Sequence, residues 1–496
     1  MKYLYHIFLV LFVFLLTGIS LSGFSQAKVE SGIDGLRTHF KDPPASARPG
    51  VYWYFMDGWM SRSGIKKDLE SMKKAGIGRV IFLEVNVGIP RGPVNFLSKQ
   101  WYELFGYAVD ECRQLGIAMT LGVGPGWAGS GGPWITAAQS MQQLVSSSIQ
   151  VSGPGEKNMD IPLPSPKRPY FGEGTFTPGL KKEWSEYYKN VAVLAFSTPQ
   201  PGKKINDVDE KALYYRAPFS SVWGVKAFLP SLAHYAHISS DEMIMKNKII
   251  NLTDKMQSNG TLKWKVPPGN WTIMRFVSRS TGALTRPAPE QGMGFECSKM
   301  DTAIVNWQLE SYVGKILNKI GRTDPKSLGG LKTLHLDSWE MGSQNWTPQF
   351  RKEFIQRRGY DPLPFYPVYA GEIVESLEMS NRFLWDVRET CDELMIDNYA
   401  KQLKKYAHRH GMNLSIEPYD MDPNADLELG SVADIPMGEF WSKGFGFNTS
   451  FSCIEAASVA HVEGEPVVQG EAFTSDADEA WKQYPGSMKN QGDWAF

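Results

Sequence analysis

The chain has 496 residues, enough for two or three domains of ordinary size. Its hydrophobic fraction of 42% and charged fraction of 21% are those of a globular protein with a large core, which excludes an extended disordered chain. Lysine plus arginine number 52 and aspartate plus glutamate 53, so the net charge of -1 gives no electrostatic reason to expect nucleic acid or an anionic membrane as a partner.

The first 27 residues are typical of a secretory signal peptide. Lys2 supplies the positive start, residues 7–16 are almost wholly apolar, and small and polar residues follow as far as Ala27. The apolar run is too short to favour a stable membrane span, although an uncleaved anchor is the alternative. We therefore expect an exported protein, periplasmic or extracellular, with no membrane contact beyond the signal peptide.

The segment up to residue 145 alternates between predicted strands and predicted helices. Glycine follows each helix, at Gly76 and Gly116, where a helix commonly ends. Repeated strand–helix units of this length indicate a parallel sheet. The expected strands are 51–55, 80–85 and 117–123, and the expected helices are 63–75 and 101–115.

The pattern then changes to short β-like runs rich in proline and glycine. Runs at 191–196, 261–266 and 271–277 are apolar or β-branched, and the turn Pro267-Pro268-Gly269-Asn270 separates the last two. These features predict an antiparallel, β-rich insertion at 146–290.

Strand–helix alternation resumes after the insertion. A long helical region is expected at 372–410, and strands are expected near residues 334, 414, 432 and 467. The chain stops at Phe496 inside an expected helix, so we expect a piece of a longer protein. The predicted fold class is α/β. The predicted organisation is a signal peptide (1–27), the first part of a (β/α)₈-type barrel (28–145), the insertion (146–290), and a second barrel part (291–496) truncated at its C-terminal end.

Five carboxylates in the second half of the chain follow short apolar runs. The carboxyl ends of parallel strands meet at one rim, which is the catalytic face of a β/α barrel, so we expect these acids to converge there. Paired carboxylates in an aromatic setting are typical of glycoside hydrolysis. For the acid of the 337–340 motif the alternative is an exposed loop position, and for Glu471 it is a rim acid that pairs with a lysine or caps the next helix. The acids are Asp337, Glu340, Glu417, Glu439 and Glu471.

Glu340 and Glu471 are the predicted acid and base. Trp339 and Trp346 lie close to Glu340 in sequence, so we expect Glu340 to be the more buried and to keep its proton near neutral pH. Glu471 is expected to stay ionised and activate water. More than two acids at one site also favour a hard cation such as calcium.

Other motifs are weaker. The turn at 122–126 resembles a phosphate-binding loop, but Pro125 lacks a donor and the following lysine is missing, so we expect a turn that presents Trp127 and Trp134 to a ligand. The acidic stretch at 420–428 lacks the glycine of an EF-hand, which favours a solvated loop. The cysteines show no metal spacing and are predicted to be buried, with one pair possible. They are Cys112, Cys297, Cys391 and Cys453.

In these motifs the chain resembles the α-L-rhamnosidases of glycoside hydrolase family 106. The resemblance spans nearly the whole mature chain. It implies a (β/α)₈ barrel interrupted by a β domain, and calcium-assisted hydrolysis with inversion. The matching stretches include 57–65, 68–78, 88–94, 124–127, 131–136, 266–272, 337–340, 344–348, 433–441 and 471–474.

The resemblance also implies roles. Glu340 corresponds to the general acid, Glu471 to the general base, and Glu439 to an acid at the calcium and sugar subsite. Larger residues than expected flank Glu340, and Gly122-Val123 replaces an expected polar pair, so the sugar is less firmly implied than the reaction. The residues expected to bind a rhamnose-containing oligosaccharide or polysaccharide are Asp337, Trp127, Trp134, Asn345, Trp346, Glu417 and Trp441.

Two other classes of function remain open from the sequence. One is an exo-glycosidase for another deoxy sugar or a uronic acid. The other is a catalytically inactive, carbohydrate-binding homologue, although such a protein has no need of an acid and base pair. A polysaccharide lyase is disfavoured because no lysine, tyrosine or histidine constellation for β-elimination is recognisable.

Overall fold

The computed structural model describes residues 33–496 except 128, 170–171, 216–234, 322, 420–423, 443–448 and 476. The chain divides into two units, residues 1–48 and residues 49–496. The first contains helix α2 (Ile33–Lys41), and the predicted signal peptide lies outside the described residues. Within the described ranges, no helix is long and apolar enough to cross a membrane.

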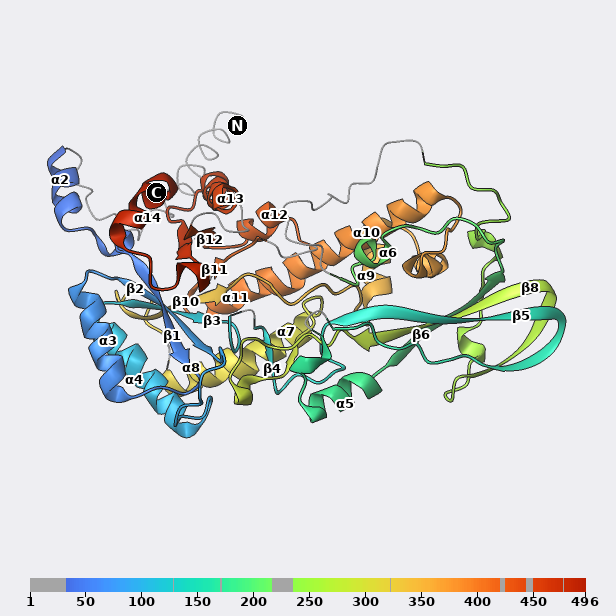
Figure 1. The fold of residues 1–496 in the computed structure, drawn as a ribbon, viewed down its shortest axis with the longest axis horizontal. Coiled ribbons are helices and arrows are strands. Elements are labelled where there is room, and N and C mark those ends of the chain that lie inside the picture. The colour runs from blue at the N-terminus through green and yellow to red at the C-terminus, as the bar shows by residue number, and fades with distance from the viewer. Residues whose placement is uncertain are drawn as a thin grey trace, which may run out of the picture. The chain divides into compact units, whose positions relative to one another are not determined.

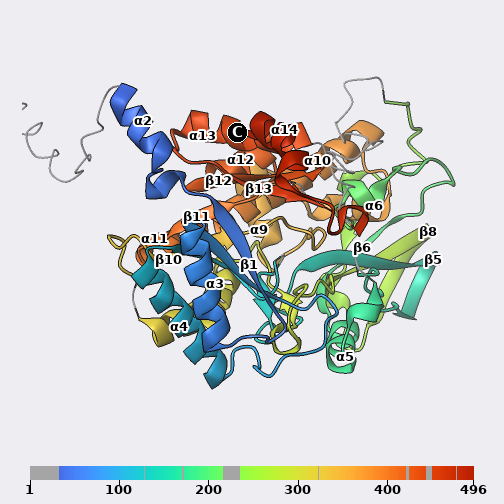
Figure 2. The same cartoon turned by 60° about the vertical axis from the view of Figure 1, so that its left-hand side comes forward.

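The larger unit is built on a curled, parallel, seven-stranded sheet that forms a half-barrel (Figures 1 and 2). β3 pairs with β10, so the strands before and after the insertion belong to one sheet, as predicted. In spatial order the strands are β1 (Gly50–Met56), β2 (Arg79–Val85), β3 (Ala118–Gly122), β10 (Gly330–Leu336), β11 (Asn413–Ile416), β12 (Ile435–Trp441) and β13 (Gln469–Thr474).

Alternation along β1 assigns its side chains to two faces. Trp53 and Phe55 join the core under the helices, whereas Tyr52 and Tyr54 point to the opposite, inner face. The neighbouring strand β2 is buried along most of its length on both faces, as expected for a parallel sheet with helices outside. The inner face therefore begins with two tyrosines whose hydroxyl groups are available for polar contacts.

Helices cover the outer face of the sheet. Ser61 caps α3 and Ser98 caps α4, and each hydroxyl accepts a backbone N–H of the first turn. Gly116, at φ 65°, ends α4 as predicted. The helices of this unit outside the insertion are α3 (Arg62–Lys74), α4 (Lys99–Leu115), α7 (Thr302–Leu309), α8 (Lys315–Ile320), α9 (Phe350–Arg358), α10 (Leu377–Met395), α11 (Lys401–Arg409), α12 (Asp426–Ser431), α13 (Thr449–Glu463) and α14 (Pro485–Ala495).

The predicted helix at 372–410 begins later and is not uniform. A π-helical turn, Ile396–Ala400, joins α10 to α11. That turn places Tyr399 edge-on against Trp339, beside the loop that follows β10. None of the four cysteines, all of which are described, forms a disulfide, and three of them are buried.

The insertion is a four-stranded antiparallel sheet whose longest strands, β5 and β8, form an extended ribbon (Figure 1). Its strands are β5 (Gln142–Asp160), β6 (Lys189–Ser197), β7 (Ile250–Asn251) and β8 (Thr261–Ser280), with helices α5 (Pro178–Glu186) and α6 (Val208–Lys211) between them. The sheet spans 142–280, whereas the exact domain boundaries stay a prediction. A short ladder of β4 (Gly131–Gly132) with β9 (Phe295–Glu296) lies at its junction with the half-barrel in sequence.

The predicted division of β8 at its proline-rich turn is wrong. β8 is continuous, and β5 pairs with it on both sides of Pro267 and Pro268. The register shifts between Gly153 and Gly155, so Pro267 and Pro268 together stand opposite the single residue Pro154 and form a bulge in β8. Proline has no N–H to donate, and a bulge is where a strand tolerates that loss.

Candidate functional site

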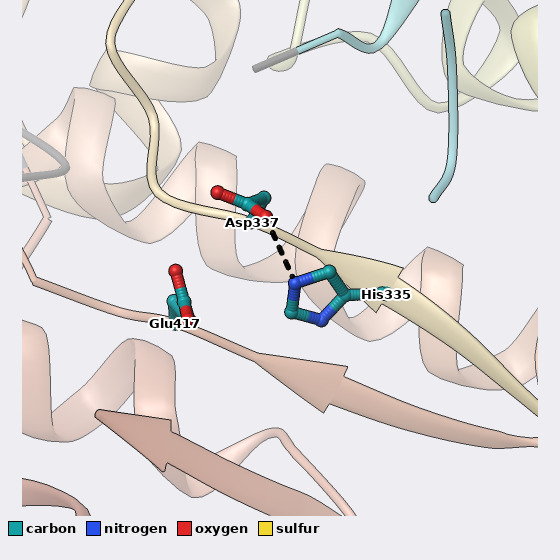
Figure 3. A group of neighbouring side chains, drawn as sticks. All are labelled: His335, Asp337 and Glu417. Atoms are coloured by element: carbon teal, nitrogen blue, oxygen red, sulfur yellow. Dashed lines mark hydrogen bonds and ion pairs between the residues drawn. The ribbon is translucent and has the colours of Figure 1, made fainter. Parts of the chain in front are cut away.

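Two acids lie side by side where neighbouring strands end. Asp337 directly follows β10, and Glu417 directly follows β11 (Figure 3). The Glu417 backbone N–H donates to the Leu336 carbonyl at 2.9 Å, so the two strands stay in register up to this point. Glu417 is fully buried and Asp337 is 7% exposed.

Glu439 and Glu471 come from the next two strands. They were predicted at strand ends, but both lie inside their strands, β12 and β13, and stand opposite each other in the parallel register. Met437, two residues before Glu439, belongs to the inner-face cluster, so Glu439 points to the same face. Both carboxylates therefore face the half-barrel interior because of strand parity rather than because a strand ends there.

Burial and the convergence of like charges raise the pKa values of Glu417, Glu439 and Glu471. Burial, followed by the charges of Asp337, Glu471 and Glu439, raises the pKa of Glu417 well above its ordinary range. Burial and Glu471 raise the pKa of Glu439 to about 8. Burial and Asp337 raise the pKa of Glu471. Among the described residues, no lysine or arginine is ion-paired with any of the four acids.

Hydroxyl groups partly offset this repulsion. The Tyr419 hydroxyl donates to Glu417 Oε2 at 2.7 Å, and Thr474 Oγ1 donates to Glu471 Oε1 at 2.6 Å. The Tyr52 hydroxyl lies 3.5 Å from Glu417 Oε1, and its hydrogen bond to Glu471 lowers the pKa of that carboxyl. Such donors favour the ionised form, so Glu471 has the surroundings of a group that can act as a base.

His335 adds an imidazole to the cluster. Its Nε2 is 3.1 Å from Asp337 Oδ2 and its Nδ1 is 2.8 Å from Ser415 Oγ, so both ring nitrogens already have protein partners (Figure 3). Ligand atoms of His335, Asp337 and Glu417 all lie within 4.8 Å of one another. Because the imidazole is engaged, the groups best able to hold a cation here are carboxylate oxygens, which suit calcium better than zinc.

Glu340 lies in the loop after β10 and is only partly buried. Trp127 Nε1 donates to Glu340 Oε2 at 3.2 Å. The Trp127 ring meets Tyr54 edge to face at 6.5 Å, and Tyr54 stacks on Tyr52 at 5.4 Å. A row of three aromatic rings thus runs from Glu340 to the tyrosine that contacts the acid cluster.

Only one of the two tryptophans expected beside Glu340 is placed there. Trp339 is buried directly before it, and its indole donates to the Gly342 carbonyl at 2.8 Å. Trp346 instead packs in the core against Phe350. Sequence proximity therefore overstated the burial of Glu340.

Two more predicted binding residues have structural partners elsewhere. Trp134 donates to Gln308 Oε1 and stacks on Tyr312 at 6.1 Å. Asn345 is fully buried, with its side chain bonded to the Leu144 N–H and the Ala212 carbonyl, so it joins the half-barrel to the insertion.

Trp441 is at the end of β12, and its hydrogen bond lowers the pKa of Glu439. Like Trp127, which donates to Glu340, Trp441 is thus a predicted binding residue that contacts one of the acids. The acidic stretch predicted as a solvated loop lies partly outside the described residues, at 420–423. Of its remaining acids, Asp426 begins α12 and Glu428 lies within it.

The sequence reading missed several polar neighbours of the acids. Alternation at 52–55 places tyrosines on one face and Trp53 and Phe55 on the other, and that pattern could have been recognised. His335 precedes Asp337 by two residues, the spacing that places two strand side chains on one face. The missed residues are Tyr52, Tyr54, His335, Ser415, Tyr419 and Thr474.

Comparison with known proteins relates this arrangement to carbohydrate-cleaving enzymes. A family model described as alpha-L-rhamnosidase, glycoside hydrolase family 106, matches residues 41–496. A protein of Formosa agariphila named "Putative beta-glucuronidase" is 36% identical over 478 residues, which cover 96% of this chain and 38% of that protein. The solved structure of a rhamnosidase from Novosphingobium sp. PP1Y matches with a TM-score of 0.71 at 23% identity, over 93% of this chain and 55% of that one. The chain thus spans about two fifths of the first relative and about half of the second.

Proposed function

This chain belongs to glycoside hydrolase family 106, and on that premise we propose that it cleaves terminal α-L-rhamnosyl residues from a polysaccharide or glycoside, with inversion, outside the cytoplasm. The observation that supports the proposal most is the convergence of Asp337, Glu417, Glu439 and Glu471 on one inner face, joined to Glu340 by an aromatic row. Tyrosine and tryptophan rings along that row offer flat apolar faces for a sugar.

Glu340 and Glu471 divide the chemistry between them. Glu471 takes a proton from water, whose oxygen attacks the anomeric carbon, while the bond from that carbon to the leaving oxygen breaks. Glu340 gives its proton to that leaving oxygen. Thr474 and Tyr52 donate to Glu471, which favours the ionised base before the reaction.

Calcium fits the acid cluster. Asp337, Glu417 and Glu439 supply hard oxygen atoms and are the residues that would hold the ion. A bound Ca²⁺ would offset the repulsion among the acids and accept sugar hydroxyl oxygens. His335 holds Asp337 in place from behind rather than joining as a ligand.

A complete (β/α)₈ barrel is the fold that we propose for the whole protein. The seven strands run parallel around a half-barrel, and their order follows the chain once the insertion is set aside. Limited proteolysis of the longer protein should leave the half-barrel strands in one fragment if this is correct. Separation of residues 291–496 from 49–145 under native conditions would argue against it.

A uronic acid is the second candidate sugar, favoured by the name of the Formosa agariphila relative. A substrate carboxylate would enter a site where burial and like charges already raise the pKa values of Glu417, Glu439 and Glu471. Without a bound cation, Coulomb repulsion disfavours that approach, whereas a neutral deoxy sugar meets no such barrier. The acids of the ion-free cluster therefore favour rhamnose over glucuronate.

Aryl glycosides can separate the candidates. The full-length protein should release nitrophenol from the α-L-rhamnoside at least about tenfold faster than from the β-D-glucuronide, because a difference of about 1.4 kcal/mol suffices for that ratio. Proton NMR of the first-formed product should show β-L-rhamnose. The opposite preference would reject rhamnose, and release of α-L-rhamnose would reject inversion.

The calcium proposal has its own test. Chelation should lower both the rate and the melting temperature, and added Ca²⁺ should restore both, because an ion that binds only the folded state stabilises it by mass action. The Glu439→Gln variant should respond less to added Ca²⁺. An identical melting temperature with and without chelator would contradict the assignment.

A further inference from the structure

A fully buried ion pair lies behind the loop that carries Glu340. Lys299 Nζ is 2.6 Å from Glu296 Oε2, and both side chains are at most 1% exposed. Glu296 also accepts from the Ser130 backbone N–H at 3.1 Å and from the Ser130 hydroxyl at 3.0 Å. The carboxylate is thus held by one cation and two neutral donors, and all three residues are buried.

The acidic end of this pair holds the segment that carries Trp127. Ser130 follows Trp127 by three residues. The chain between them packs tightly, because a Cβ added to Gly129 would lie only 2.0 Å from the Pro125 carbonyl oxygen. Because Gly129 packs closely on Pro125, we expect that displacing Ser130 from Glu296 also displaces Trp127. Trp127 is the residue that donates to the Glu340 carboxylate.

Lys299 contacts the loop on both sides of Glu340, through its ammonium group and through its backbone N–H. The Lys299 ammonium lies 4.1 Å from the centre of the Trp339 ring, directly before Glu340 in sequence. The Lys299 backbone N–H donates to Gln344 Oε1 at 3.1 Å, four residues after Glu340. One buried pair therefore connects the loop that bears Glu340 with the turn that bears its hydrogen-bond donor.

Buried ion pairs are weak devices for stability, because desolvating two charges offsets most of their attraction. They are better suited to holding the segments that they connect in one conformation. From these contacts we propose that Glu296 and Lys299 are positioning residues for the general acid: they hold the Glu340 carboxyl against Trp127 at the point where the leaving oxygen arrives. This proposal rests on the proposed function, since it presumes that Glu340 donates a proton.

The expected effect follows from that role. A general acid displaced by about 1 Å loses a large part of its rate contribution. Substrates with a poor leaving group depend on that proton, whereas a 2,4-dinitrophenyl leaving group departs without it. A defect in positioning therefore depends on the leaving group, and a general loss of folded protein does not.

The test compares three variants on a rhamnosyl disaccharide and on 2,4-dinitrophenyl α-L-rhamnoside. The double variant Glu296→Gln/Lys299→Met leaves no buried net charge, so it should fold. Its kcat should fall about 10–100-fold on the disaccharide and less than about threefold on the aryl substrate. Ser130→Ala removes only the hydroxyl contact and should show the same pattern with about a threefold loss on the disaccharide. Arg275→Met, which removes a buried cation from the insertion sheet, should lower both rates equally or neither.

Glu340→Gln separates the two levels of the proposal. If it shows the leaving-group pattern and neither the double variant nor Ser130→Ala does, the positioning role is overturned and the proposed function stands. If Glu340→Gln lacks the pattern, the proposed acid itself is wrong. If the double variant does not fold, Ser130→Ala decides, and equal loss on both substrates overturns the positioning role.

Discussion

Buried charges are arranged in opposite ways in the insertion sheet and at the half-barrel rim. In the insertion, Arg275 is 3% exposed and donates to the Asn190 side chain and the Ile161 carbonyl. Arg279 is 4% exposed and donates to three backbone carbonyls. Each cation has its own neutral acceptors, which is how a protein buries a charge for structural purposes.

At the rim, buried acids face one another instead. Glu417 is fully buried, and its neighbours Asp337, Glu439 and Glu471 all raise its pKa. Such an arrangement lowers stability, and natural proteins keep it where function requires it. The contrast indicates that the kind of partner separates structural from functional charges, whereas burial alone does not.

Glu84 is a buried acid of a third kind, on the outer face of β2 with Trp101 as a hydrogen-bond donor. Burial raises its pKa from 4.5 to about 7. The folded state therefore holds the proton more tightly, and stability is lost as pH rises from about 4.5 through about 7. The loss through this one carboxyl is about 3 kcal/mol.

Glu84→Gln should remove that pH dependence. Urea unfolding at pH 5 and pH 8 should show that the unfolding free energy of the variant rises relative to that of the wild type by about 2.5 kcal/mol between the two conditions. Hydrolytic rates should be unchanged. A loss of activity without a change in stability would place Glu84 in the functional class and contradict the comparison.

The Arg275→Met variant tests whether the buried cation of the insertion sheet contributes to stability alone. It leaves Asn190 Oδ1 and the Ile161 carbonyl without their buried donor. We expect about 2–3 kcal/mol of lost unfolding free energy. Denaturant unfolding measures the loss, and kcat on an aryl rhamnoside should stay within about twofold of wild type. A greatly reduced kcat in folded protein would show that the insertion sheet contributes to the reaction.

Tyr52→Phe tests how the acid cluster sets the pKa of Glu471. The Tyr52 hydrogen bond lowers the pKa of Glu471, so its removal should raise that pKa. The acidic limb of the kcat/KM profile should move upward by about one pH unit, equivalent to about 1.4 kcal/mol. The alkaline limb, which reports the general acid, should not move. A shift of the alkaline limb instead would exchange the roles of Glu340 and Glu471.

Glu417→Gln should show the smallest effect on stability. Burial and like charges raise the pKa of Glu417, so its contribution to the unfolding free energy is lost as the pH rises. At pH 8 the variant with a neutral amide should therefore be more stable than the wild type. With chelator present we expect about 1 kcal/mol of stabilisation at pH 8, little difference at pH 4, and loss of activity. Thermal melts at both pH values check the sign, and destabilisation at pH 8 would contradict it.

The sequence predicted the sheet well because alternation and capping are local. The strand at 80–85 and the helix ends at Gly76 and Gly116 depend on neighbouring residues, and the structure has them within a residue or two. β8 was misread because Pro267 and Pro268 form a bulge inside a strand that is held on both sides by pairing with the distant strand β5. Pairing across more than a hundred residues leaves no local signal.

The acids were recognised, but their surroundings were not. Glu439 and Glu471 face each other through strand register, which depends on how β12 and β13 align. Trp346 and Asn345 lie close to Glu340 in sequence yet pack into the core, because the loop turns away after Gly342. Proximity along a chain predicts contact inside a strand or helix and fails in a loop.

In the proposed reaction Glu340 gives a proton and Glu471 takes one, and one crossed comparison of two variants on two substrates tests both roles. Rates of Glu340→Gln and Glu471→Gln are measured on a rhamnosyl disaccharide and on 2,4-dinitrophenyl α-L-rhamnoside. We predict that Glu340→Gln loses about 10²–10⁴-fold on the disaccharide and little on the aryl substrate, whereas Glu471→Gln loses that much on both. The reverse pattern, or full activity of either variant on both substrates, would contradict the account.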